Sequence, residues 1–187
     1  MRKNKTAKMG IVVAILLLTV AFAAVVTNLT INGTASVKAN NDEFARNIKF
    51  STATDTKPYL TVNGVTVTEE GKTPTVADDG KSITFTAPAF DTIGNNAELH
   101  YWIVNESTNY NAELGELTCD VTSQNAEVSI DYIKVTPKNN FKGTTLQSGT
   151  TTTSNDSVKV EMVKSYVGDA ENTYNITCRI PATGSEK

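Results

Sequence analysis

The sequence predicts an all-β protein: a jelly-roll or immunoglobulin-like β-sandwich preceded by an N-terminal hydrophobic signal or anchor helix. Threonine occurs 29 times in 187 residues, and its β-branched side chain suits a pleated, half-buried surface. Nearly every apolar segment after the first 26 residues alternates with period two, which indicates strands with one solvated face. Turn sequences separate these segments at intervals of about 8–15 residues, a spacing typical of sandwiches.

The first 26 residues have the three parts of a secretory signal. A basic head with Arg2 and Lys3 precedes the apolar run Ile11–Val26, which contains the small-residue motif Ala21-Phe22-Ala23. The run is 16 residues long, whereas a bilayer span needs about 20. A cleaved signal peptide and an uncleaved membrane anchor over residues 11–26 therefore both remain open. In either case the basic head stays in the cytosol, and residues 27–187 form a single exported domain, secreted or held at the cell surface.

The exported part is acidic. Without the four basic residues of the head, 13 basic face 20 acidic residues, a formal net charge of −7. This balance argues against a nucleic-acid partner. About 160 residues are enough for one domain with a substantial core.

Strands are expected wherever apolar residues alternate, and turn residues separate them. Asn63-Gly64 between two alternating triplets predicts a hairpin, and Asp78-Asp79-Gly80 predicts a second tight turn. The polar stretch 148–157 is expected to be a loop, and only 42–46 admits a short turn of helix. The predicted strands cover residues 29–39, 47–51, 59–67, 82–87, 97–105, 116–121, 126–136, 157–166 and 173–180.

Cys119 and Cys178 are the two cysteines of the chain. Each lies in phase with the apolar positions of its predicted strand, so both thiols are expected on a buried face. Export to an oxidising compartment favours a disulfide between them, which would add roughly 4 kcal/mol in the chain-entropy model. Two buried, reduced thiols that act as small hydrophobic side chains are the alternative.

No motif in the sequence indicates catalysis or a cofactor. His100 is the single histidine and lies in a predicted strand, and the zinc, phosphate-loop, dinucleotide and nucleophile-elbow motifs are all missing. Carboxylate pairs such as Asp78 and Asp79 occur in turns, where acidic residues are common. We therefore expect a protein that is not an enzyme, with no catalytic residue, no cofactor and no metal.

Three aromatic residues are candidates for a contact surface. Tyr101, Trp102 and the nearby Tyr110 are the side-chain types that form platforms for sugars. Alternation places Tyr101 and Trp102 on opposite faces of one strand, so one of the two must point away from the core. This surface would contact a glycan or another subunit, whereas core packing is the structural alternative for a single tryptophan.

Several segments resemble exported proteins of the TasA/camelysin type from Gram-positive bacteria. The similar segments are the end of the apolar run with the following Leu29–Lys38, then Val76–Phe85, then Ile103-Val104-Asn105 with Asn111-Ala112, and two closing strands after a Gly/Ser/Thr loop. The resemblance implies a jelly-roll-like sandwich, and members of this type include biofilm-matrix fibre subunits. In such fibres the N-terminal segment of one subunit completes the sheet of the next.

The segment Leu29–Lys38 is the candidate for this donor role. It contains no proline and carries its one charge at its end, so it is able to pair with a sheet edge. Its alternative is to pair within its own domain as the first strand. The apolar positions that fall on one face of this segment are Leu29, Ile31, Gly33, Ala35 and Val37.

Two functions follow from these observations. The first is an exported structural or surface protein, an extracellular-matrix or fibre subunit that self-associates by β-strand addition. The second is a monomeric module, tethered to the membrane by residues 11–26, that binds glycans through its exposed aromatic residues.

Overall fold

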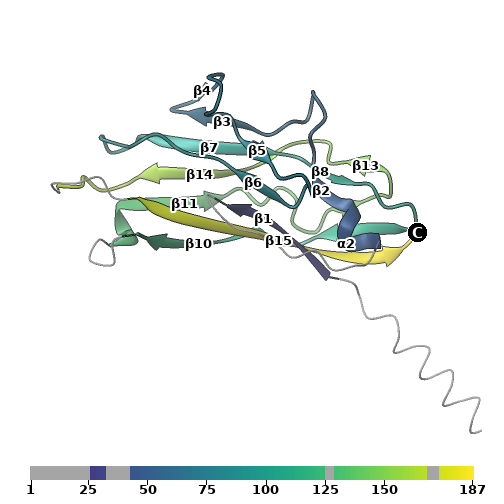
Figure 1. The fold of residues 1–187 in the computed structure, drawn as a ribbon. Coiled ribbons are helices and arrows are strands. Elements are labelled where there is room, and N and C mark those ends of the chain that lie inside the picture. The colour runs from purple at the N-terminus through teal and green to yellow at the C-terminus, as the bar shows by residue number, and fades with distance from the viewer. Residues whose placement is uncertain (1–25, 33–42, 125–128, 168–172) are drawn as a thin grey trace, which may run out of the picture.

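Two layers of mostly antiparallel strands pack face to face in the computed structural model (Figure 1). The structure describes residues 26–32, 43–124, 129–167 and 173–187. The architecture confirms the predicted all-β sandwich. The predicted signal or anchor helix lies outside the described residues.

The first layer is a seven-stranded sheet in the order β12-β9-β15-β1-β6-β5, with β10 also paired to β15. The long strand β15 lies at its centre, because β1, β9 and β10 all pair with it antiparallel. The strands are β1 (Val26–Asn32), β5 (Thr75–Val76), β6 (Ser82–Thr84), β9 (Tyr110–Leu114), β10 (Thr118–Ser123), β12 (Thr145–Leu146) and β15 (Tyr174–Glu186).

The second layer consists of a five-stranded sheet, β11-β14-β7-β3-β4, and a three-stranded sheet, β13-β8-β2. The chain passes from β7 to β8 through Trp102, and the carbonyl of Trp102 accepts a hydrogen bond from the Ser51 amide at 2.9 Å. The strands are β2 (Ile48–Phe50), β3 (Tyr59–Val62), β4 (Val65–Thr66), β7 (Asn96–Tyr101), β8 (Ile103–Asn105), β11 (Ile133–Pro137), β13 (Thr150–Thr151) and β14 (Asp156–Met162).

Helical structure is limited to two short elements among the described residues. The helix α2 (Glu43–Asn47) buries Phe44 and Ala45, and the 3₁₀ turn η1 (Ile130–Tyr132) precedes β11. Neither is long or apolar enough to cross a membrane, and the described residues contain no other helix.

The core lies between the layers and is built by alternation. Residues of β7 alternate between half-buried and buried along its whole length, as a strand with one face on a core requires. Fully buried side chains come from both layers and from α2, and the largest apolar ones are Tyr101, Phe44, Phe50, Ile48, Leu60, Ile83, Leu99, Ile103 and Leu114.

The structure differs from the sequence prediction in its less regular strands. β9 was not predicted, because Asn, Ala and Glu have low strand propensity, yet pairing with β15 and β12 makes it a strand. β15 continues beyond Ile180 to Glu186, and its Pro181 lies opposite Asn28 of β1. The segment predicted as a polar loop, 148–157, contains the short strand β13 and the start of β14.

Candidate assembly site

The N-terminal strand β1 lies inside the first layer, between β15 and β6 (Figure 1). It pairs antiparallel with β15 along its whole length, from Val26 opposite Thr183 to Asn32 opposite Thr177. On its other side, its last three residues pair parallel with β6. The strand therefore completes the sheet from within and does not border it.

The register of β1 agrees with the alternation expected for the donor segment. Leu29 is paired with Ile180, and Ile31 with Cys178 on one side and Ile83 on the other. Ile180, Cys178 and Ile83 are each at most 1% exposed. Position 29 is therefore in line with a core position of β15, and position 31 with core positions of both β15 and β6. The remaining candidates of this segment, Gly33, Ala35 and Val37, lie outside the described residues.

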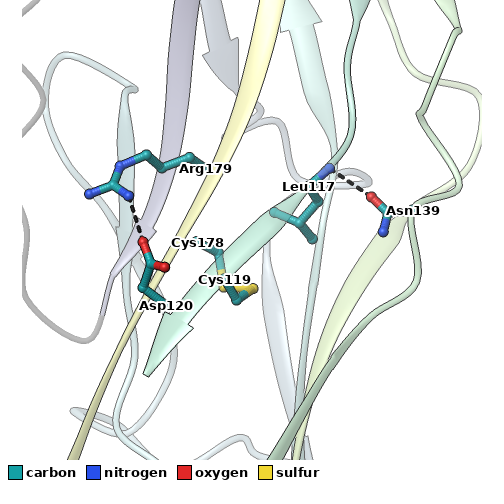
Figure 2. Close-up of a disulfide and its surroundings, with 6 residues drawn as sticks. All are labelled: Leu117, Cys119, Asp120, Asn139, Cys178 and Arg179. Carbon is teal, nitrogen blue, oxygen red and sulfur yellow. Dashed lines mark hydrogen bonds and ion pairs between the residues drawn. A yellow bond between two sulfur atoms is a disulfide. The ribbon is translucent and has the colours of Figure 1, made fainter. Parts of the chain in front are cut away.

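A disulfide holds β15, one of the two strands that flank β1. Cys119 of β10 and Cys178 of β15 are directly paired in the ladder, and their sulfur atoms are bonded (Figure 2). Beside them, Arg179 donates to Asp120 at 2.8 Å, and this ion pair is exposed. The two cysteines that the sequence left as a disulfide or as free thiols are thus joined, and they tie β15 to a second strand independently of β1.

A buried lysine holds β6, the other strand that flanks β1. Lys81 directly precedes β6 and is 1% exposed, and its ammonium group donates to the carbonyl of Ile48 in β2. Its amide donates to the Asp79 carboxylate at 2.8 Å. Burial lowers the pKa of Lys81 to about 8, with the Lys49 charge acting in the same direction. Through this side chain, β6 is held against the second layer.

Tyr101 is not available as a contact residue, which corrects its assignment as a candidate contact aromatic. It is fully buried and packs edge-on against Phe50 and Phe141, with ring centroids 5.5 and 5.9 Å away. Its hydroxyl has no hydrogen-bond partner among the described residues, and burial raises its pKa well above the usual value. Alternation put either Tyr101 or Trp102 in the core, and the core residue is Tyr101.

Trp102 belongs instead to an aromatic cluster on the outer side of the second layer. The Tyr59 ring is stacked on His100, with centroids 4.5 Å apart and an interplanar angle of 11°, and Trp102 lies 6.1 Å from Tyr59. All three are half-buried. His100 and Trp102 are two positions apart in the sequence, but the contact with Tyr59 depends on the pairing of β3 with β7, which no local pattern predicts.

Polar groups adjoin this cluster. The Glu98 carboxylate accepts a hydrogen bond from the Ser157 hydroxyl at 2.5 Å and lies 3.9 Å from Nε2 of His100. Burial lowers the pKa of His100, and the charge of Glu98 opposes that shift. The imidazole Nδ1 is buried without a hydrogen-bond partner among the described residues.

Tyr110, the third predicted aromatic, makes its ring contact elsewhere. It packs edge-on against Phe44 of α2, with centroids 6.1 Å apart. The three candidate contact aromatics therefore lie in different places: Tyr101 in the core, Trp102 in the outer cluster and Tyr110 against α2. No group of three or more His, Cys, Asp or Glu side chains within the described ranges is arranged to hold a metal ion.

Comparisons with known proteins add little to this description. No family model matches the chain, and no curated protein matches it. Among solved structures, envelope protein VP37 of White Spot Syndrome Virus is similar over 71% of this chain and 99% of its own, with 12% identity and a TM-score of 0.36. Values this low support no argument about function.

Proposed function

We propose that this protein is an exported structural subunit, of the TasA/camelysin fibre type, whose copies assemble by exchanging the N-terminal strand. The observation that carries the proposal is the place of β1 between β15 and β6. A copy that gives its β1 to a neighbour must receive one in return, so each sheet in the fibre is complete. The copies would assemble by strand exchange, in which each copy inserts its β1 into the sheet of the next. This differs from simple strand addition, in which a strand pairs with an open edge.

The energetics of the sheet support exchange. Without β1, the facing backbone groups of β15 and β6 lose their partners, and unpaired backbone groups are costly when buried. A β1 from another copy makes the same hydrogen bonds in the same register, so exchange costs little at equilibrium. The Cys119–Cys178 bond and the Lys81 contact with β2 hold the two flanking strands while β1 leaves.

A cysteine pair placed across β1 and β15 tests the exchange directly. Val26 and Thr183 are paired in the register and lie several residues from the native cysteines. The variant Val26→Cys/Thr183→Cys is assembled and then oxidised, and the products are separated on a non-reducing denaturing gel. Exchange predicts covalent multimers from the assembled fraction and intramolecular bonds in the monomer fraction. The single variant Val26→Cys is the control. Assemblies that yield only intramolecular bonds would refute the proposal.

A proline in β1 provides an independent measurement. Thr30 is paired with exposed Arg179, so valine is tolerated there, whereas proline removes a backbone donor. We expect Thr30→Val to assemble and Thr30→Pro to lose assembly. Addition of a synthetic peptide with residues 26–38 should then cap the vacated position and restore the folded monomer. Normal fibres from Thr30→Pro would count against a role of β1.

A second candidate function is a membrane-tethered module that binds glycans. The observation in its favour is the outer cluster of Tyr59, His100 and Trp102, because aromatic faces beside hydroxyl and carboxylate groups suit the apolar and polar sides of a sugar. Intact-mass analysis that finds Met1 in the membrane fraction, together with glycan binding lost in Trp102→Ala and kept in Tyr110→Ala, would favour this module over the fibre subunit. A mature N-terminus near Ala24 would count against this module.

A further inference from the structure

A cavity of about 370 Å³ opens between the two layers, at the end of the sandwich where β15 begins. Its inner wall is formed by Val160 and Met162 of β14 and by Ile176 of β15, with Phe85 and Phe90 from the loop after β6. Val160 and Met162 are buried core residues. The cavity is therefore a hollow in the apolar interior that reaches the surface.

The chemistry of the lining restricts what can occupy it. Neither Asp, Glu, Lys nor Arg is among the described residues that line it, so these residues offer an ion no compensating charge for its lost hydration. Three tyrosines contribute rings: Tyr132 and Tyr166 meet edge-on at 5.2 Å, and Tyr174 donates its hydroxyl to the Ser129 carbonyl at 3.2 Å. With Phe85 and Phe90, five aromatic rings surround the space. Such walls favour an uncharged ligand that presents a ring.

Three exposed apolar residues lie near lining residues of the cavity in the chain. Ile130 is 47% exposed, Val163 37% and Val167 94%, and these residues flank Tyr132 and Tyr166 in the chain. The Val163 amide donates to the Tyr132 carbonyl at 2.9 Å, which brings the two segments together. Exposed apolar side chains close to a concave apolar site are typical of a binding surface.

We propose that this cavity binds a small, uncharged molecule with an aromatic ring. The ring packs among Phe85, Phe90 and the three tyrosines, and the amides of Gln124 and Asn175 in the lining supply polar contacts. The site is separate from the β1 position, so this inference stands whether or not the proposed assembly is correct.

Fluorescence titration with the neutral probe N-phenyl-1-naphthylamine tests the site. The wild type should give saturable binding of one probe molecule per chain. Ala87→Trp fills the cavity from the flanking loop, and Phe90→Asp places a charge in its wall. Each should weaken binding about tenfold or more while circular dichroism and melting remain those of a folded domain. Val65→Ser is the matched control, because Val65 is 71% exposed on β4 and is not part of the lining; it should bind as the wild type does.

Three results would overturn the proposal. The first is unsaturable or equal fluorescence in all four proteins. The second is probe binding that disappears as the protein concentration rises, which would assign the cavity to a second copy of the chain. The third is binding that appears only after residues 33–38, which follow β1, are replaced by a Gly-Ser linker, because the chain itself would then be the occupant.

Discussion

Removing the Cys119–Cys178 bond should destabilise the domain by about 4 kcal/mol. The two cysteines are 59 positions apart, and for a loop of this size the chain-entropy model gives about 4 kcal/mol of constraint on the unfolded chain. The bond joins residues that are already paired between β10 and β15. The native strands therefore need not move when the bond is broken, and the expected effect lies mainly in the unfolded state.

Urea denaturation of the purified domain measures this effect. The oxidised wild type, the same protein reduced, and Cys119→Ala/Cys178→Ala are compared by tryptophan fluorescence and circular dichroism. At a typical slope of about 2 kcal/mol per molar urea, the midpoint should fall by about 2 M in both altered proteins. Because Cys178 is fully buried, the double alanine variant should fall somewhat further than the reduced protein through lost packing.

The effect of the disulfide on stability can be distinguished from that of the residues around it (Figure 2). Asp120→Asn removes only the exposed ion pair with Arg179 and should change the unfolding free energy by at most about 1 kcal/mol. Equal midpoints for the oxidised and reduced wild type would refute the reasoning, because a bond that closes so long a loop must then leave the unfolded chain unconstrained.

Three further changes have expected outcomes. Burial holds the pKa of Lys81 at about 8, so between about pH 8 and 10.5 the unfolded chain binds more protons than the folded protein. The free energy of unfolding should therefore rise with pH across that window. The urea midpoint of the wild type should be higher at pH 9.5 than at pH 7.5, and this difference should be much smaller in Lys81→Met. Burial also lowers the pKa of His100, so stability should decline as the pH falls below about 6.5, and His100→Gln should weaken that decline in thermal melts between pH 7.5 and 5. Gly115→Ala would place a Cβ 2.6 Å from the Pro181 ring and should cost about 1–3 kcal/mol in urea denaturation, whereas an unchanged midpoint would show that β15 shifts without cost.

Local patterns predicted the parts of the fold that depend on one strand at a time. Period-two alternation gave the sandwich and divided Tyr101 from Trp102, and Asn63-Gly64 marked the hairpin between β3 and β4. Alternation also put both cysteines on buried faces. It did not show that β10 and β15 are neighbours, because the pairing of two distant segments cannot be predicted from the pattern of either segment alone.

The candidate sites were less accessible from sequence for the same reason. The contact of Tyr59 with His100 and Trp102 arises from cross-strand register, and the cavity is lined by segments that are far apart in the chain. Lys81 directly follows the predicted turn Asp78-Asp79-Gly80, and no local pattern marks it as a core residue, yet it is almost completely buried. The fold buries its stem and leaves the Ile48 carbonyl as its partner.

The interior position of β1 has the largest consequence for function. An edge strand is added to a sheet without disturbing it, and any exposed edge competes for it. A strand between β15 and β6 satisfies backbone groups on both sides and is in register with the buried Cys178 and Ile83. When β1 leaves, a β1 from another copy can restore these pairs, because it has the same register and alternation. The self-association that we propose would therefore use the same pairing that completes the monomer.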